Sequence, residues 1–138
     1  MTIPLRVLLL EDSEDDATLL LRALRRSGFE VVWERHQTAA GLVAAVKREP
    51  WDFIFSDYHM PAFSALAALK LVDELGLDLP VIVVSGERAE EYALSALQAG
   101  ARNYILKDDL TNLGPAVMRE LGRGGRLQVP RKDCQPRL

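Results

Sequence analysis

The sequence lacks the features of a secreted or membrane-bound protein. Its single cysteine, Cys134, has no partner for an internal disulfide. The N-terminus shows no positively charged segment followed by an apolar stretch of signal length. Apolar runs such as Val7 to Leu10 are far shorter than the about 20 residues that a membrane-spanning helix needs. These absences predict a protein of the cytoplasm that makes no membrane contact.

Basic charge is also scarce in most of the chain. Five of the 17 basic residues and one of the 20 acidic residues lie in residues 123–138, so residues 1–122 hold 12 basic and 19 acidic side chains. The net charge is −3 for the whole chain and −7 for this long segment. An acidic body with a short basic end argues against a surface that binds nucleic acid directly.

Internal repeats and low-complexity segments are absent as well, and the length fits one domain. The chain has 138 residues, and domains typically have about 100 to 150. After residue 122 the sequence is rich in glycine, proline and basic residues, which is typical of a frayed end or a linker. We expect one domain over residues 1–122 and a basic, flexible tail or linker over residues 123–138.

Apolar residues gather in short runs that do not alternate with polar residues. The four clearest runs lie near residues 6–10, 52–56, 81–84 and 103–106. Such runs are typical of parallel strands that are buried on both faces of a sheet. A weaker strand, Val31 to Trp33, follows Gly28. Trp33 and Trp51 are both expected to pack in the interior.

Segments of helical length and pattern lie between these runs. In the first of them Leu20, Leu21 and Leu24 are spaced for one buried face, and Ser13 stands where its side chain could cap the helix. The predicted helices span Asp15–Ser27, Ala39–Lys47, Ser64–Leu75, Ala89–Ala99 and Leu110–Leu121, the last becoming regular near Gly114. Strands that alternate with helices in this way predict a doubly wound α/β fold with a parallel sheet.

Polar and charged side chains follow the predicted strands at the points where the strands end. They are Glu11, Asp12, Asp57, Ser85 and Lys107. In doubly wound sheets ligands bind beyond the carboxyl ends of the strands, so these side chains are expected to meet. Three carboxylates would repel one another without a cation, and Mg²⁺ prefers carboxylate oxygens. An ammonium and a hydroxyl group beside them suit phosphoryl transfer, with Asp57 as the nucleophile.

Short motifs stand at these strand ends and in the loops that follow. They are Glu11-Asp12, Asp57-Tyr58-His59-Met60-Pro61, Ser85-Gly86, Ala99-Gly100-Ala101 and Tyr104-Ile105-Leu106-Lys107. Together they resemble the receiver domain of two-component response regulators, over roughly residues 5–122. The resemblance implies a flavodoxin-like (βα)5 fold whose strands lie in the order 2-1-3-4-5. It also implies a signalling phosphoprotein rather than an enzyme that turns over a substrate.

The resemblance assigns roles to the residues at the strand ends. It implies that Asp57 accepts a phosphoryl group from a phosphohistidine of a sensor histidine kinase or of a histidine phosphotransfer protein. Glu11, Asp12 and Asp57 would hold Mg²⁺ together with the backbone carbonyl of His59. Lys107 would pair with the phosphoryl group.

Two further residues resemble those that change position in this family when the receiver is phosphorylated, called the switch residues. Ser85 matches the hydroxyl residue that moves toward the phosphate, and Tyr104 matches the aromatic residue that turns inward behind it. The surface that changes in relatives is the fourth helix, the fifth strand and the fifth helix, here about residues 89–121. It would bind a downstream protein that the sequence does not identify. A homodimer through the fourth and fifth helices is a further implication.

The sequence departs from the family pattern beside Lys107. Asp108 follows it, where the family usually has a proline after a cis peptide bond. A cis bond before a residue other than proline costs about 2.5–4 kcal/mol. Either the loop is trans and rearranged, or the site is strained.

Other functions are open on the same fold. A degenerate receiver would bind partners without being phosphorylated. An Asp-nucleophile phosphatase usually has a second carboxylate two residues after the nucleophile, where this chain has His59. A flavin or nucleotide site needs a phosphate-binding loop after the first strand, and the acidic segment Glu11 to Asp16 would repel phosphate. The chain is either a stand-alone receiver or a piece of a larger regulator.

Overall fold

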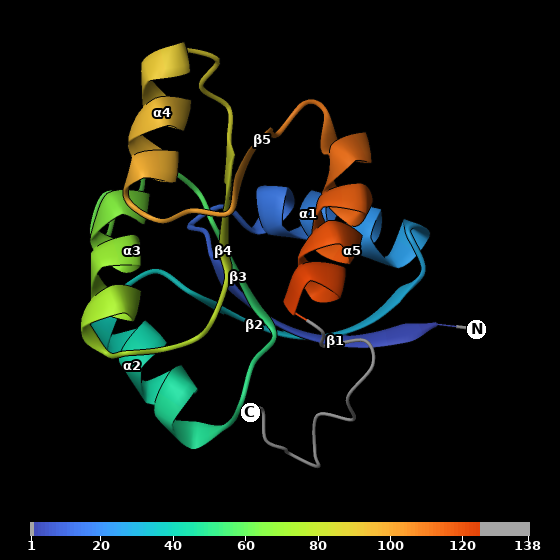
Figure 1. Cartoon of the computed structure of the whole chain (residues 1–138), viewed down its shortest axis with the longest axis horizontal. Helices are drawn as coiled ribbons and strands as arrows, with labels where there is room; N and C mark the ends of the chain where they lie inside the picture. Colours follow the sequence, from blue (N-terminus) through green and yellow to red (C-terminus); the bar gives the residue numbers. More distant parts are fainter. Residues whose placement is uncertain (1, 125–138) are drawn as a thin grey trace.

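A five-stranded parallel sheet forms the centre of the computed structural model, which describes residues 2–124 (Figure 1). The strands are β1 (Ile3–Leu10), β2 (Phe29–His36), β3 (Phe53–Ser56), β4 (Val81–Ser85) and β5 (Asn103–Leu106). Their order across the sheet is β2-β1-β3-β4-β5, and all neighbouring strands run parallel. The predicted fold class and strand order are confirmed.

Helices cover both faces of this sheet. They are α1 (Glu14–Arg26), α2 (Ala39–Arg48), α3 (Ala65–Glu74), α4 (Glu90–Gln98) and α5 (Leu113–Gly124), with a 3₁₀ turn, η1 (Leu110–Asn112), before α5. Buried side chains of α1 and α5 pack on one face, and those of α2, α3 and α4 pack on the other (Figure 1). Within the described residues, no helix is long and apolar enough to cross a lipid bilayer.

The central strands serve both of these cores. Leu9 of β1 packs with the α1 and α5 side chains, whereas Leu8 packs with those of the other face. Successive residues of a strand point to opposite faces, so a strand covered on both sides is apolar at every position. This explains why the central strands are the clearest signals in the sequence.

The helix boundaries follow from local signals in the sequence. The Ser13 side chain accepts a hydrogen bond from the backbone N–H of Asp16 at 3.2 Å, as the predicted cap requires. Gly28 after α1 and Gly100 after α4 have φ angles of +100° and +113°, a region that glycine enters without steric cost. Both helices therefore end where the sequence predicts.

The last helix begins close to its predicted start and extends past the predicted end at Leu121. Helix α5 becomes regular at Leu113, one residue before the predicted Gly114. It reaches Gly124, where the described residues end. The rest of the predicted tail, residues 125–138 with Cys134, lies outside the described residues.

Strand β2 differs from its prediction. It has eight residues, Phe29–His36, where the sequence predicts only three. Because β2 lies at an edge of the sheet, it meets solvent and carries charged residues that interrupt the apolar pattern. Trp33 is 42% exposed, so the expectation that it packs in the interior is wrong. Trp51 is buried as expected, and its indole N–H donates to the carbonyl of Ala45 at 3.0 Å.

Helices α1 and α5 approach closely at Ser27 and Gly114. A Cβ atom placed on Gly114 would lie 2.5 Å from the Cβ of Ser27, closer than two such atoms approach in proteins. We therefore expect Gly114→Ala to lower the free energy of unfolding by about 1–3 kcal/mol, as overpacking of a core does. Urea unfolding followed by circular dichroism measures this change.

Gly122→Ala is the matched control for this substitution. No heavy atom lies within 4 Å of a Cβ placed there, and alanine favours a helix over glycine. Adding Ser27→Gly to Gly114→Ala should recover much of the lost stability, because it removes the opposing Cβ atom. Equal stability of the wild type and Gly114→Ala would contradict the close contact.

Candidate functional site

The ladder between β1 and β3 brings two acidic residues together. Leu10 pairs with Ser56, so the residues that follow them, Glu11 and Asp57, leave the sheet side by side. The backbone N–H of Asp57 donates to the carbonyl of Leu10 at 2.9 Å, which extends the ladder to the acidic residue itself. The positions of these two carboxylates therefore depend on strand register and not on a flexible loop.

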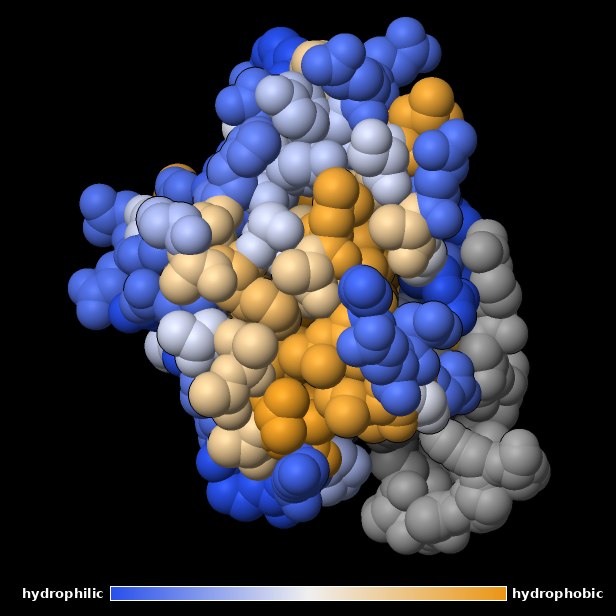
Figure 2. Space-filling model, turned by 90° about the vertical axis from the view of Figure 1, so that its left-hand side faces the viewer, coloured by the Kyte–Doolittle hydropathy of each residue, from blue (hydrophilic) through white to orange (hydrophobic). Residues whose placement is uncertain are grey.

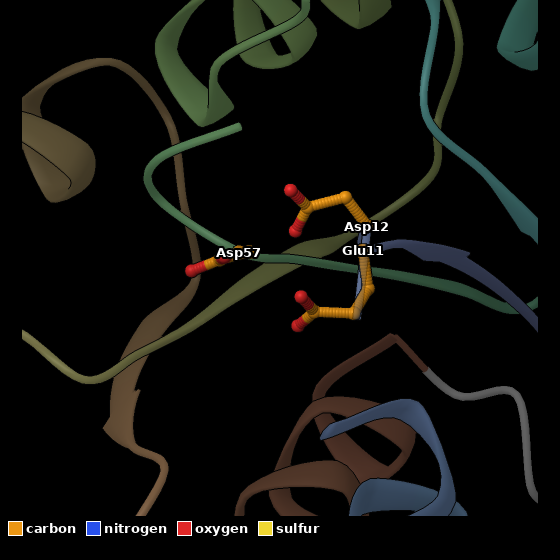
Figure 3. Close-up of side chains that lie close together, drawn as sticks. All are labelled: Glu11, Asp12 and Asp57. Carbon is orange, nitrogen blue, oxygen red and sulfur yellow. The ribbon is translucent and has the colours of Figure 1, made fainter. Parts of the chain in front are cut away.

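Glu11, Asp12 and Asp57 form a compact cluster of carboxylates (Figure 3). One oxygen atom of each residue lies within 4.8 Å of those of the other two. Glu11 is buried and the Asp57 side chain is 12% exposed, whereas Asp12 is exposed. A hard divalent cation prefers oxygen ligands of this kind, so these three residues could hold one.

Burial makes this cluster costly to ionise. Burial and the charge of Asp57 raise the pKa of Glu11 from 4.5 to about 7. Burial also raises the pKa of Asp57, although the ammonium group of Lys107 opposes the shift. Positive charge at this edge of the sheet therefore stabilises the ionised form of both residues.

Lys107 provides positive charge from the end of β5. Its Nζ atom lies 3.1 Å from Oε1 of Glu11, 3.4 Å from Oδ2 of Asp57 and 2.6 Å from Oδ2 of Asp16. Burial acts to lower the pKa of Lys107, but the hydrogen bonds to Asp16 and Glu11 and the nearby charges raise it above its ordinary value. The ammonium group is therefore charged at neutral pH and offsets part of the negative charge of the cluster.

The loop after β5 positions Lys107 without a cis peptide bond. The backbone N–H of Lys107 donates to the carbonyl of Ser85 at 2.9 Å, which continues the ladder between β4 and β5. No peptide bond among residues 2–124 is cis. Of the two alternatives for the bond between Lys107 and Asp108, the structure has the trans form. Asp108 forms an exposed ion pair with Arg88 from the loop after β4.

Ser85 and Tyr104 meet at the backbone of Glu87. Ser85 is 1% exposed, and its hydroxyl oxygen accepts a hydrogen bond from the Glu87 N–H at 3.1 Å. The hydroxyl of Tyr104 donates to the Glu87 carbonyl at 2.8 Å. Burial raises the pKa of Tyr104, so this hydroxyl stays protonated and able to donate. The segment after β4 thus links the two residues.

Tyr58, the neighbour of Asp57, belongs to an aromatic cluster that the sequence did not reveal. Its ring centroid lies 4.8 Å from that of His59, 4.9 Å from that of Tyr92 and 6.3 Å from that of Tyr104. The side chain of His59 is exposed and also lies against Tyr92, with centroids 5.1 Å apart. Tyr58 and His59 are neighbours in the loop after β3, whereas Tyr92 belongs to α4 and Tyr104 to β5, so no local spacing in the sequence indicates the contact between the three segments.

The contact between Asp16 and Lys107 is also not predicted from the sequence. Asp16 lies in the first turn of α1 and not at a strand end, so the search for polar residues after apolar runs did not include it. One signal was available. Because Ser13 caps the helix, Asp16 lies in the turn that begins directly after Glu11 and Asp12.

Comparison with protein families gives one clear match. The model described as "Response regulator receiver domain" matches residues 7–117. Over 116 residues the chain is 33% identical to "Transcriptional regulatory protein PrrA" of Mycobacterium tuberculosis. It is 28% identical over 122 residues to "Two-component response regulator ORR21" of Oryza sativa subsp. japonica. These alignments cover 84% and 86% of this chain but only 46% and 18% of the relatives, so the chain spans less than half their length.

Solved structures show the same similarity. The receiver domain of the putative response regulator NarL from Mycobacterium tuberculosis superposes with a TM-score of 0.75 and 26% identity, over 87% of this chain and 98% of that one. A CheY-like receiver domain protein from Methanospirillum hungatei JF-1 gives a TM-score of 0.73 over 92% of this chain and 99% of that one. At 23% identity, the second match supports the fold alone.

The raised pKa of Glu11 should make the metal-free protein less stable as the pH rises. Folded Glu11 keeps its proton up to about pH 7, whereas unfolded Glu11 releases it near 4.5. Between these values the folded state binds the extra proton, so stability falls with increasing pH. We expect the free energy of unfolding, measured by urea titration in EDTA, to fall by about 1–3 kcal/mol between about pH 5 and 8.

Two glutamine variants test the origin of this slope. Glu11→Gln should remove most of it, because an amide does not ionise. Glu14→Gln is the matched control, since Glu14 is exposed and lies three residues away in the sequence. A slope that is the same in Glu11→Gln and the wild type would contradict the raised pKa.

Proposed function

The chain belongs to the response regulator receiver domain family, and we propose that it is a phosphoacceptor that uses Asp57. Receivers of this family interact with histidine kinases or phosphotransfer proteins, so the proposed donor is a phosphohistidine of such a protein. The observation that carries the proposal is the placement of Asp57 between the ammonium of Lys107 and two further carboxylates.

In the proposed transfer a carboxylate oxygen of Asp57 attacks the phosphorus atom of the donor. A phosphorus–oxygen bond forms, the phosphorus–nitrogen bond breaks, and the donor imidazole keeps the electron pair of that bond. Lys107, 3.4 Å from Oδ2 of Asp57, is close enough to pair with an oxygen of the incoming phosphoryl group. It also favours the ionised, nucleophilic form of Asp57 against the effect of burial.

Glu11, Asp12 and Asp57, with the backbone carbonyl of His59, are the proposed ligands of Mg²⁺. The donors fit this cation because they are hard oxygen atoms that lie within 4.8 Å of one another. When bound, the cation neutralises negative charge on the carboxylates and on the phosphoryl oxygens. The raised pKa of Glu11 is a further sign that the cluster lacks positive charge without it.

Ser85 and Tyr104 are the proposed switch residues. Both bond to the backbone of Glu87, so a movement of Ser85 toward the phosphoryl group would alter the contact that holds Tyr104. The two states need to differ by only a few kcal/mol for one phosphoryl group to shift the population. This coupling connects Asp57 to β5 and to the start of α4.

The proposed output surface consists of α4, β5 and α5, about residues 89–121. Figure 2 shows that apolar side chains gather in the middle and lower part of the face that carries α2, α3 and α4, below the level of α4 itself. On α4, Leu94 and Leu97 are 54% and 46% exposed, and exposed apolar patches mark interaction sites. A downstream protein or a second copy of the chain would bind here. In this proposal residues 1–122 are the receiver and residues 123–138 are a tail or linker.

Substitution of Asp57 should abolish phosphorylation. After incubation with acetyl phosphate and Mg²⁺, we expect the wild type to gain the mass of one phosphoryl group and Asp57→Asn to gain none, because an amide is not a nucleophile. Intact mass spectrometry measures both. Asp15→Asn, at an exposed aspartate, should be labelled like the wild type. Undiminished labelling of Asp57→Asn would sink the assignment, and an unlabelled wild type would favour an interaction module that works without phosphorylation.

Mg²⁺ should stabilise the folded protein through the same cluster. A ligand at 100 times its Kd that binds only the folded state adds about 2.7 kcal/mol, which raises Tm by several degrees for a domain of this size. The increase should be larger at pH 8 than at pH 6, because Glu11, with a pKa of about 7, must release its proton. Thermal unfolding with Mg²⁺ or with EDTA measures the increase.

The matched pair for this experiment is Asp12→Asn and Asp15→Asn, two exposed aspartates that lie close in sequence. Asp12→Asn should lose most of the Mg²⁺-dependent increase in Tm, and Asp15→Asn should keep it. An equal increase in both variants would mean that the cation binds elsewhere.

A further inference from the structure

The shortest contact of the Lys107 ammonium is with a carboxylate outside the carboxylate cluster. Nζ lies 2.6 Å from Oδ2 of Asp16, compared with 3.1 Å from Oε1 of Glu11 and 3.4 Å from Oδ2 of Asp57. An ammonium group has three N–H donors, so these three acceptors match its capacity. Asp16 and Lys107 are 91 residues apart in the sequence, and their contact joins the first turn of α1 to the end of β5.

The three acceptors differ in what else they can bind. Glu11 and Asp57 belong to the cluster that could hold a cation, whereas Asp16 does not. A cation or a phosphoryl group at the cluster would draw the oxygen atoms of Glu11 and Asp57 into other bonds. Asp16 lies outside the cluster, so a cation bound there would leave its carboxylate available to Lys107.

Asp16 is itself held by a rigid element. Its backbone N–H donates to the cap oxygen of Ser13 at 3.2 Å, and the next residue, Ala17, is 4% exposed in the core. The backbone under Asp16 therefore cannot move without disturbing the start of α1. A carboxylate on such a backbone can fix a flexible partner.

A lysine such as Lys107 needs a partner to hold its ammonium group in one position. Its side chain has about 2 kcal/mol of rotamer entropy and carries a point charge on a flexible stem. The loop after it is joined to a neighbouring loop by the Arg88–Asp108 ion pair, and both of these side chains are largely exposed. Exposed ion pairs contribute little, so this one restrains the loop weakly.

We propose that Asp16 is a positioning residue that holds the ammonium of Lys107 beside Asp57 during phosphoryl transfer. The inference rests on the proposed function, because it assigns Asp16 a role in the reaction of Asp57. Asp16 does not touch the reacting atoms in this account. It acts by reducing the number of positions that Lys107 occupies.

The alternative role for Asp16 is to stabilise the N-terminus of α1 by its charge alone. Asp15 lies in the same turn and carries the same charge, but it is exposed. Asp16→Asn and Asp15→Asn therefore form a matched pair in which only the first removes the carboxylate that contacts Lys107. Asp16→Glu keeps the charge and should restore part of the effect.

The first measurement is the rate of labelling of the full chain by acetyl phosphate in saturating Mg²⁺. We expect Asp16→Asn to be about 10-fold slower than the wild type, which corresponds to about 1.4 kcal/mol in the barrier. Asp15→Asn should stay within about 2-fold. In a Lys107→Gln background Asp16→Asn should cause no further loss, because the residue acts through the lysine.

The second measurement is independent of phosphorylation. Urea unfolding of the metal-free wild type, the two single variants and the double variant gives the coupling between Asp16 and Lys107. We expect Asp16→Asn to be less destabilising in the Lys107→Gln background than in the wild type.

The outcomes separate this inference from the proposed function. A labelled wild type with Asp16→Asn as fast as Asp15→Asn would overturn the positioning role and leave Asp57 as the phosphoacceptor. An equal slowing in the presence and absence of Lys107 would also overturn it. If the wild type is not labelled, the proposed function fails, and additive losses in the unfolding cycle would then show that Asp16 does not hold Lys107 either.

Discussion

Repulsion between like charges is the constraint that shapes the carboxyl edge of the sheet. Leu10 pairs with Ser56 in the ladder between β1 and β3. The backbones of Glu11 and Asp57, which directly follow these residues, are therefore held side by side. Burial strengthens the repulsion by removing the water that would screen it. Lys107 places a positive charge beside these carboxylates, and its hydrogen bonds to Asp16 and Glu11 raise its pKa above the ordinary value although burial acts to lower it.

The parallel ladders that crowd these charges also connect them to the rest of the molecule. The ladder between β4 and β5 ends with the Lys107 N–H bonded to the Ser85 carbonyl, so the lysine and the proposed switch hydroxyl share one backbone contact. Tyr104 reaches the same region through Glu87, and Tyr58 extends the contact to Tyr92 on α4. These contacts form a continuous set from the strand ends to α4, along which the proposed switch would act.

The sequence predicts this site well where a function depends on strand ends, and poorly where it depends on packing between elements. The five strands follow from apolar runs, and the meeting of Glu11 with Asp57 follows from the rule that ligands bind beyond the carboxyl ends of parallel strands. The order of the strands follows only from the resemblance to receiver domains. The full length of β2 is not predicted, because an edge strand needs only one apolar side and carries charges among its β residues. The contact of Asp16 with Lys107 spans 91 positions, and neither helical nor strand periodicity contains information about such a pair.

The crowded charges also indicate what the proposed phosphorylation would have to change. An acyl phosphate at Asp57 would carry about 1.5 to 2 negative charges at neutral pH in place of the single charge of the carboxylate. It would do so beside Glu11, whose pKa burial and the charge of Asp57 already raise to about 7. In the present arrangement the ammonium of Lys107 already lies within 3.4 Å of the carboxylates of Glu11, Asp16 and Asp57. The new oxygen atoms would need further donors, and Ser85, whose hydroxyl oxygen now accepts a hydrogen bond from the Glu87 N–H, stands at the end of the adjoining strand β4. The oxygen atoms of a phosphoryl group on Asp57 would attract positive charge and hydrogen-bond donors. This attraction is the physical reason that the segment after β4, with Ser85, would move when Asp57 is phosphorylated.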